Sequence, residues 1–216
     1  MKTKYRILLW DMDGTIMDSE EGLIRSIDYT FEKCGLPRET TETYRSYLGL
    51  SLKHTFRTHY HLSDEKADEA VQVFRAWFHD HDMLQGNRMF AGIRDLLTDL
   101  KAAGYRMAVA TSKLEEFALE IAEHFGLTPY FEHICGSDRA GLRPEKSEVI
   151  TWTLQQFPDC DPKEVLMIGD RDTDVLGARQ NGIDVAAVLY GYGSREETAD
   201  ADYQLASVDE LRAFLL

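Results

Sequence analysis

Short apolar runs alternate along the chain with segments of helical periodicity. The segments between the runs place apolar residues three or four positions apart, which is typical of helices that pack through one face. This alternation predicts an α/β fold, with a Rossmann-like parallel sheet covered by helices on both faces. The apolar runs of strand length are Tyr5–Trp10, Tyr105–Ala110, His133–Cys135, Val165–Ile168 and Val185–Tyr190.

Residues 18–85 interrupt the alternation, because their pattern is helical throughout. One apolar stripe runs from Leu23 to Phe31, and another follows Ser63, which we expect to be an N-cap. A helical insert of this size after a first strand predicts a lid or cap domain. The expected domains are a catalytic core of residues 1–17 and 86–216 and a helical cap of residues 18–85.

Composition and charge narrow the range of partners. With 44% hydrophobic and 29% charged residues, the 216-residue chain has the composition of an ordinary globular protein. Lys and Arg number 24 and Asp and Glu 38, which gives a formal net charge of −14. Such a charge repels nucleic acids and anionic membranes, so we expect neither as a partner. An anionic small substrate then requires a local cation or a metal ion.

Cysteine usage and the N-terminal pattern indicate a compartment. Cys34, Cys135 and Cys160 are far apart and odd in number, which argues against a disulfide framework or a structural zinc site. The apolar run Ile7–Trp10 is too short for the core of a signal peptide or for a membrane span. We therefore expect a cytoplasmic protein, as a monomer or a homodimer.

The first chemical motif follows the first predicted strand, as Asp11-Met12-Asp13-Gly14-Thr15. One carboxylate at such a strand end can attack phosphorus, and a second can act as general acid and base. Gly14 permits a turn and a close approach of the backbone to a ligand. The alternative is an ordinary Asp-Gly turn.

Two further motifs offer phosphate ligands. Thr111-Ser112-Lys113 follows a predicted strand, where a hydroxyl and backbone N–H groups can bind phosphate; a plain N-cap is the alternative. Lys146 stands before a predicted helix and can offset the charge of nucleophile and phosphate, although a lysine there is usually solvated. Arg143, three residues earlier, is a second candidate for the same role.

The fourth motif ends another strand with Gly169-Asp170-Arg171-Asp172-Thr173-Asp174. Carboxylates at a strand end are ligands that suit Mg²⁺, which takes one or two of them together with substrate and water. Asp174 can also serve only as an acidic residue in the first turn of a helix. The four motifs occur at the ends of predicted strands, and a parallel sheet brings those ends to one edge.

These four motifs, in this order and spacing, resemble those of the haloacid dehalogenase-like hydrolase superfamily, in the subgroup with a small helical cap inserted after the first strand. The resemblance covers essentially the whole chain and is greatest to phosphoglycolate phosphatase-like and 5′-nucleotidase-like members. The segments that carry it are Leu8–Ser19, Ala110–Lys113, Gly169–Gly182 and Leu189–Glu197. An aspartate at position 13 is unusual for the dehalogenases, phosphonatases and transport ATPases of the superfamily, so the resemblance favours phosphate ester chemistry.

The resemblance implies a role for each motif residue. Asp11 is the implied nucleophile and a Mg²⁺ ligand, and Asp13 is the implied general acid/base, whose backbone carbonyl also binds the metal. Asp170 and Asp174 are the implied further metal ligands, Asp174 directly or through the surrounding shell. The remaining implied site residues are Thr15, which positions the others, Gly14 and Ser112 beside the substrate, and Thr111 and Lys146, which bind the transferred phosphoryl group.

One loop of the predicted cap is a candidate for substrate specificity. In Tyr47–Lys53, Gly49 permits a turn and Lys53 offers a charge, and the superfamily places a specificity loop in this region. A plain interhelical loop with a solvated lysine is equally consistent with the sequence. Five of the seven histidines also fall in residues 18–85, but their spacing fits no ligand pattern on one helix face, which favours a polar surface.

The expected function is a Mg²⁺-dependent phosphatase that acts on small phosphomonoesters, of the phosphoglycolate or nucleoside monophosphate type, through an aspartyl phosphate. One alternative is a phosphomutase of the β-phosphoglucomutase type, which would return the phosphoryl group to a sugar and release no inorganic phosphate. Another is an inactive binding or regulatory protein that retains the fold.

Overall fold

The computed structural model describes residues 3–216, which form two compact units. The core unit contains the described residues up to Asp18 together with Met89–Leu216, and the helical unit is Ser19–Arg88. The chain passes between the units at β2 (Met17–Asp18) and β3 (Arg88–Met89), which pair as a small two-stranded sheet.

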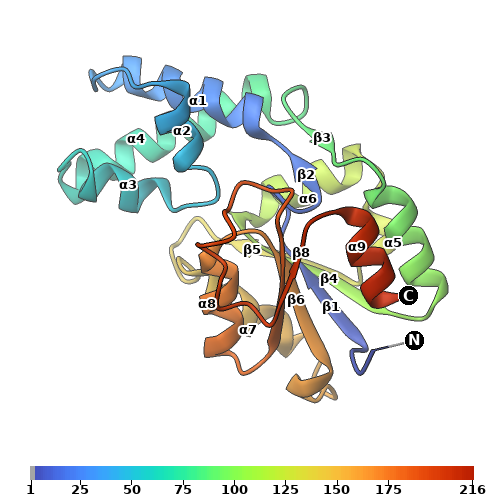
Figure 1. Ribbon diagram of the computed structural model, residues 1–216. Helices are drawn as coiled ribbons and strands as arrows, with labels where there is room; N and C mark the ends of the chain where they lie inside the picture. The colour runs from blue at the N-terminus through green and yellow to red at the C-terminus, as the bar shows by residue number, and fades with distance from the viewer. Residues whose placement is uncertain (1–2) are drawn as a thin grey trace. The chain divides into compact units, whose positions relative to one another are not determined.

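A six-stranded sheet forms the centre of the core unit, with the order β5-β4-β1-β6-β7-β8 and every neighbouring pair parallel (Figure 1). The central strand β1 is buried along its whole length, which explains its uninterrupted apolar sequence. The strands are β1 (Ile7–Trp10), β4 (Arg106–Leu114), β5 (His133–Ser137), β6 (Val165–Gly169), β7 (Asp184–Val188) and β8 (Tyr203–Leu205).

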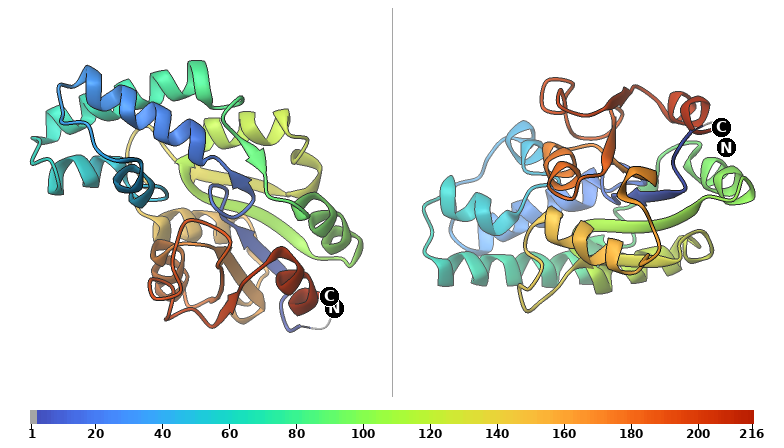
Figure 2. Two further views of the ribbon diagram at one scale, coloured as in Figure 1. Left: turned by 45° about the horizontal axis from the view of Figure 1, so that its top comes forward. Right: turned by 90° about the horizontal axis from the view of Figure 1, so that it is seen from below.

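Helices cover both faces of the sheet (Figure 2). On one face, alternate residues of β1, Ile7 and Leu9, join a buried cluster with Val149 and Ile150 of α7 and Val175 of α8. The opposite face is covered by α5 and α6, with α9 packed against α5. The core helices are α5 (Ile93–Ala102), α6 (Glu115–His124), α7 (Lys146–Gln155), α8 (Asp172–Gln180) and α9 (Val208–Leu215), with short 3₁₀ turns η2 (Thr128–Tyr130) and η3 (Pro162–Glu164).

The helical unit packs around a cluster of aromatic rings. Phe31 is fully buried and makes edge contacts with Tyr44 and Tyr60. In the same unit, Asp82 accepts hydrogen bonds from Arg25 and Ser26, so this buried carboxylate is paired. The elements are α1 (Glu20–Lys33), α2 (Thr41–Ser46), α3 (Leu52–Thr58), α4 (Asp64–Trp77) and a π-helical turn η1 (Phe78–Asp82).

The predicted parallel α/β fold is confirmed, although several elements differ from those expected. β4 extends beyond the expected Ala110 to Leu114, where it pairs again with Ser137 of β5 after a register shift. The chain also ends in a strand, β8, and a helix, α9, that the apolar pattern did not predict. Ser63 is the N-cap of α4, as expected, and accepts a hydrogen bond from Lys66 N.

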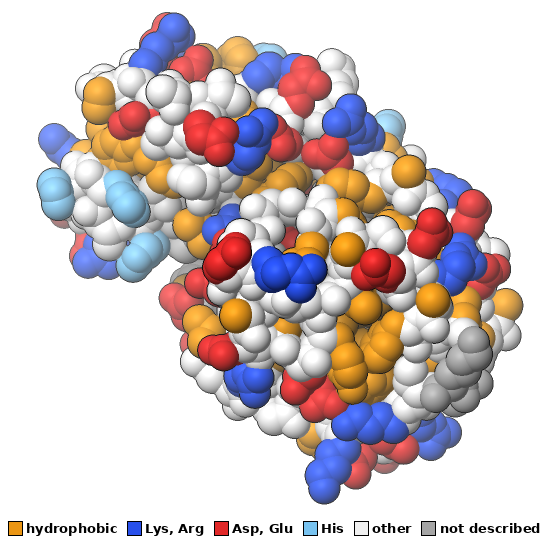
Figure 3. Space-filling view, viewed as in Figure 1, with side chains coloured by type: hydrophobic (Ala, Val, Ile, Leu, Met, Phe, Trp, Pro, Cys, Tyr) orange, Lys and Arg blue, Asp and Glu red, His pale blue; other side chains and the backbone are white. Residues whose placement is uncertain are grey.

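Charged side chains of both signs lie on the surface (Figure 3), and the cysteines are unpaired. On the face seen in Figure 3, basic and acidic side chains lie interspersed. All three cysteines carry free thiols. Within residues 3–216, no helix has the length and apolar character that a membrane span requires.

Candidate active site

Three buried carboxylates meet at one edge of the sheet. Ligand oxygens of Asp11, Asp170 and Asp174 lie within 4.8 Å of one another, and these residues are at most 6% exposed. Asp11 directly follows β1 and Asp170 directly follows β6. Since β1 and β6 are hydrogen-bonded neighbours, with Asp11 N donating to Ile168 O at 2.8 Å, the parallel register brings both aspartates to the same edge.

Asp174 reaches this edge because α8 begins close to the end of β6 and Asp174 lies in its first turn. It is the third residue of α8, and its Oδ2 accepts hydrogen bonds from Asp170 N and Arg171 N, each at 3.0 Å. An acidic side chain in this position satisfies N–H groups that have no partner inside the helix. The helix start and the carboxylate cluster are therefore one structure.

Lys146 is the first residue of α7 and points its ammonium group into the carboxylate cluster. Its Nζ lies 2.8 Å from Asp11 Oδ1 and 2.7 Å from Asp174 Oδ1, with the side chain only 3% exposed. Burial opposes its charge, but Asp11 and Asp174 outweigh burial and raise the pKa of Lys146. The lysine therefore stays charged between the two carboxylates.

The carboxylates themselves are held in an unfavourable environment. Burial, followed by the charges of Asp174 and Asp11, raises the pKa of Asp170 well above its usual value. Burial also raises the pKa of Asp174 to about 6, although Lys146 acts in the opposite direction. A cluster in which ionisation is this costly is a favourable place for a cation.

Asp170 is fixed by the loop that carries Gly14 and Thr15. Thr15 Oγ1 donates to Asp170 Oδ1 at 3.2 Å. Gly14 has φ +82°, and a Cβ at this position would lie 2.2 Å from Asp170 Oδ2. Glycine is therefore required twice here, for its left-handed backbone and for the closeness of the carboxylate.

A second loop, Tyr190–Ser194 after β7, closes over the other side of Asp170. Tyr192 N donates to Asp170 Oδ2 at 2.7 Å. A Cβ at Gly191 would lie 2.3 Å from Gly14 O, and one at Gly193 would lie 1.9 Å from Asp170 O. This hydrogen bond was not predicted from the sequence; the spacing of the two glycines is the pattern that could have indicated a close approach of the loop.

Asp13 lies outside the three-carboxylate cluster and has a basic partner. Its Oδ2 is 2.9 Å from Lys113 Nζ, with the two side chains 15% and 5% exposed. Thr111 and Ser112 were predicted from the sequence as site residues, whereas Lys113 was not. Thr111 is buried and its Oγ1 accepts from Lys113 N at 3.3 Å, whereas Ser112 is exposed.

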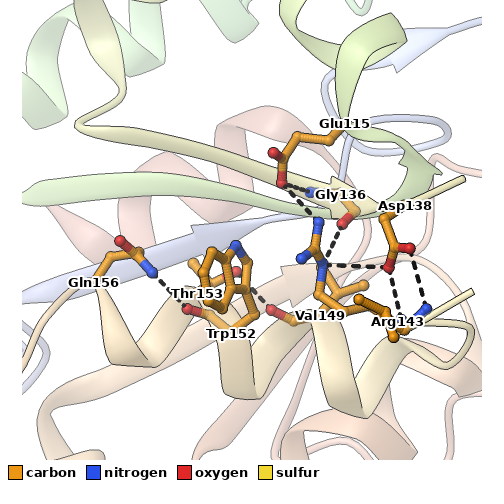
Figure 4. Close-up of polar contacts among 9 residues, drawn as sticks. Glu115, Gly136, Asp138, Arg143, Val149, Trp152, Thr153 and Gln156 are labelled. Atoms are coloured by element: carbon orange, nitrogen blue, oxygen red, sulfur yellow. Dashed lines mark hydrogen bonds and ion pairs between the residues drawn. The ribbon is translucent and has the colours of Figure 1, made fainter. Parts of the chain in front are cut away.

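Arg143, the alternative to Lys146, is engaged elsewhere (Figure 4). Its Nε donates to Gly136 O at 3.0 Å, and the guanidinium group lies 3.3 Å from Glu115 Oε2. The same group stands 5.0 Å from the centre of the Trp152 ring. Arg143 therefore ties the loop before α7 to β5 and α6, and Lys146 is the residue beside Asp11.

The cap candidates Gly49 and Lys53 belong to the helical unit. Gly49 has φ +80° in the turn after α2, as its predicted role in a turn requires. Lys53 lies in the first turn of α3, rather than in the loop, and its Nζ is 2.6 Å from Asp68 Oδ1. Within residues 3–216, the one group of side chains placed to hold a metal is the aspartate cluster, which includes no histidine.

Comparison with known proteins identifies the family to which the chain belongs. The family model described as haloacid dehalogenase-like hydrolase matches residues 8–188. A 5′-nucleotidase of Pseudomonas aeruginosa is 37% identical, over 90% of this chain and 87% of its own. Tyrosine-protein kinase PtkA of Mycobacterium tuberculosis is 35% identical, over 97% and 72%. Phosphoglycolate phosphatases are among the more distant matches.

Solved structures with a similar fold include predicted phosphatases. The crystal structure of a predicted phosphatase from Clostridium acetobutylicum superposes with a TM-score of 0.93 at 36% identity, and 98% of each chain is covered. A parallel sheet with an aspartate after its central strand, a lysine from a following helix and two further carboxylates defines a class of hydrolases. This chain belongs to the haloacid dehalogenase-like hydrolase family, as its motifs indicated.

Proposed function

We propose that this protein is a Mg²⁺-dependent phosphatase that hydrolyses small phosphomonoesters through an aspartyl phosphate on Asp11. The observation that carries the proposal is the position of Lys146 Nζ, 2.8 Å from Asp11 Oδ1 in a buried cluster. A buried ammonium beside a carboxylate neutralises charge where an anionic phosphoryl group has to approach a negative nucleophile. This contact supports chemistry at Asp11 rather than a purely structural ion pair.

The donor set fits a divalent cation. Four carboxylates against two ammonium groups leave two uncompensated negative charges when all are ionised, which one Mg²⁺ ion would balance. Oxygen donors are also the ligands that Mg²⁺ prefers. Bound Mg²⁺ supplies positive charge that stabilises the phosphoryl oxygens. The proposed ligands are the side chains of Asp11, Asp170 and Asp174 and the backbone carbonyl of Asp13; the charges counted are those of Asp11, Asp13, Asp170, Asp174, Lys113 and Lys146.

The reaction proceeds in two halves on the protein's own side chains. In the first, a carboxylate oxygen of Asp11 forms a bond to phosphorus while the bond to the leaving oxygen breaks and Asp13 gives that oxygen a proton. In the second, Asp13 takes a proton from water as the water oxygen attacks phosphorus. The bond between phosphorus and Asp11 then breaks, and inorganic phosphate leaves.

The remaining core residues hold the phosphoryl group during transfer. Lys146 and the hydroxyl of Thr111 bind its oxygens in this proposal, and Gly14 and Ser112 border it with backbone and side chain. Thr15 keeps Asp170 in place through the 3.2 Å hydrogen bond. Such fixed donors lower the barrier because they need no rearrangement when charge moves.

The names of the relatives indicate the substrate class. A 5′-nucleotidase and phosphoglycolate phosphatases act on small phosphate monoesters, which supports an ester of phosphoglycolate or nucleoside monophosphate type for this chain. Gly49 and Lys53 stay predicted substrate contacts, and a cytoplasmic monomer or homodimer stays the predicted state.

Release of inorganic phosphate from a panel of monoesters, together with the anhydride pyrophosphate, tests the proposal. The panel contains phosphoglycolate, nucleoside monophosphates, sugar phosphates, pyrophosphate and 4-nitrophenyl phosphate, each with Mg²⁺ and with EDTA. Asp11→Asn should reduce release to background, while Asp159→Asn, a change at an exposed residue, should leave it unchanged. Metal-independent release, or full activity of Asp11→Asn, contradicts the proposal. Isomerisation of sugar phosphates without release of phosphate would identify a phosphomutase instead.

A further inference from the structure

The ion pair between Lys113 and Asp13 is the part of the site that the proposed mechanism leaves unused. Lys113 Nζ lies 2.9 Å from Asp13 Oδ2, and the two side chains are 5% and 15% exposed. Lysine is rarely buried to this degree without a role for its charge, because removing an ammonium group from water is costly. Its partner is the residue proposed to move protons in both halves of the reaction.

The backbone that carries Lys113 is fixed by close packing. Lys113 lies where β4 and β5 change register, between Ala110 and Leu114. Such an irregularity redirects side chains that would otherwise keep their place in the strand. A Cβ at Gly136 of β5 would lie 2.5 Å from Lys113 O, so the two backbones pack in direct contact.

Neighbouring polar contacts hold the same segment. Glu115, two residues after Lys113, accepts from Gly136 N at 3.2 Å and pairs with Arg143, as Figure 4 shows. The β4 end, β5 and the loop before α7 are thereby joined. Lys113 therefore starts from a rigid base, which is what a residue that positions another side chain requires.

The backbone of Asp13 is fixed as well, by a tight turn. Met12 O accepts hydrogen bonds from Ile16 N at 3.0 Å and Met17 N at 2.8 Å, and Gly14 N donates to Met17 O at 2.8 Å. This turn fixes where the Asp13 side chain begins but not where its carboxylate points. The contact with Lys113 acts on the carboxylate itself.

We propose that Lys113 is a positioning residue that, through its contact with Oδ2, holds the Asp13 side chain in the place from which the other oxygen of its protonated carboxyl group gives a proton to the leaving oxygen. This inference rests on the proposed phosphatase function. The proton passes from Asp13 to the leaving oxygen as the bond from that oxygen to phosphorus breaks, and Asp13 recovers a proton from water in the second half. Lys113 takes no part in these bonds and acts through the direction of the carboxylate.

The dependence of rate on the leaving group measures this role. An alkoxide is a poor leaving group and needs the proton, whereas 4-nitrophenolate leaves without one. The value of kcat/KM reports only the steps up to transfer of phosphorus to Asp11. The comparison uses 4-nitrophenyl phosphate and the alkyl phosphate of the panel that the wild-type protein hydrolyses fastest.

Lys113→Met should lower kcat/KM about 100-fold for the alkyl ester and less than about threefold for the aryl ester, because general acid catalysis contributes about 10²–10⁴-fold. Asp13→Asn should show the same selectivity, and Lys113→Arg should restore part of the alkyl activity. The exposed Lys163→Met is the matched control and should change neither value. The ratio of the two substrates is measured on one preparation, so it does not depend on the fraction of folded protein.

A double-mutant cycle completes the test. If Lys113 acts through Asp13, Lys113→Met should cost little further activity in the Asp13→Asn background. Three outcomes would each overturn the role of Lys113 but leave the proposed phosphatase function standing. They are equal losses of kcat/KM on both substrates, additive losses in the cycle, and unchanged rates for Lys113→Met when the wild-type protein is active. A wild-type protein that releases phosphate from no ester would refute the proposed function itself. A wild-type protein that cleaves only aryl esters would overturn the general-acid step and this inference with it.

Discussion

Replacing Lys146 with methionine tests the charge balance of the site directly. The Lys146 ammonium lies 2.8 Å from Asp11 Oδ1 and 2.7 Å from Asp174 Oδ1, in a position that is almost closed to water. Methionine retains most of the apolar stem and removes the charge, so packing changes little. The carboxylates of Asp11, Asp170 and Asp174 then face one another without the ammonium group that pairs with Asp11 and Asp174.

The expected loss of stability is large for a protein of this size. Breaking a buried ion pair by removal of one partner costs about 3–5 kcal/mol, whereas a whole domain is stable by roughly 5–15 kcal/mol. Because each kcal/mol shifts the midpoint of a chain of this length by about 2–4 °C, the metal-free variant should unfold about 6–20 °C below the wild-type protein.

Thermal unfolding in EDTA and in excess Mg²⁺ measures this effect. Mg²⁺ should raise the midpoint of Lys146→Met more than that of the wild-type protein, because the variant lacks one compensating charge. Turnover should fall by about 10²–10³-fold even with Mg²⁺, as for the loss of other fixed charge-stabilising donors. Lys163→Met, at an exposed position, is the control for loss of a lysine. A metal-free Lys146→Met variant that unfolds within 2 °C of the wild-type protein would refute the electrostatic reasoning.

Three further outcomes are expected. Gly193→Ala should lower the free energy of unfolding by about 1–3 kcal/mol and weaken Mg²⁺ binding, measured by calorimetry, because its Cβ would lie 1.9 Å from Asp170 O. Gly141→Ala is the control, since a Cβ there meets nothing within 4 Å and adds only backbone strain. Equal Mg²⁺ affinity of the two variants would contradict this prediction. The folded, metal-free protein holds the Asp174 proton up to about pH 6, while the unfolded chain loses it near 3.8, so stability from urea unfolding should fall as pH rises between these values. Asp174→Asn should make this slope less steep without removing it, because the raised pKa of Asp170 gives a slope of the same sign, and an unchanged slope would assign it to other groups. Mg²⁺ should also flatten the slope in the wild-type protein, and EDTA should restore it.

Residues whose roles are local are the ones that the sequence predicts best. The strand before Asp11 is recognisable because a central parallel strand is buried on both faces and therefore apolar throughout. The carboxylates after β1 and β6 could be expected to meet, because adjacent parallel strands end at one edge. The preference for Lys146 over Arg143 depends instead on the resemblance, because a lysine placed before an apolar helical face matches a common form of the superfamily's motif.

Elements at the end of the core were harder to predict. β8 is three residues long and only partly buried, so it lacks the apolar run by which the other strands are found. α9 has a clearer pattern, since Ser207 caps it by accepting from Glu210 N at 3.2 Å. The serine and the glutamate three residues later form a recognisable helix start, but the helix is too short to show a full periodic stripe.

The contacts that complete the site depend on three-dimensional detail that residue types do not encode. Lys113, which contacts Asp13, lies where β4 changes register against β5 beyond Ala110, and no pattern of polar and apolar residues specifies that change. Gly193 matters only because the backbone of Asp170 lies where a Cβ would be. Motifs therefore identify the groups able to carry out the chemistry, while the packing of backbone against backbone determines how each group is aimed. For this reason Lys113→Met and Gly193→Ala are the more searching tests of the site, since both leave every motif aspartate and Lys146 in the chain.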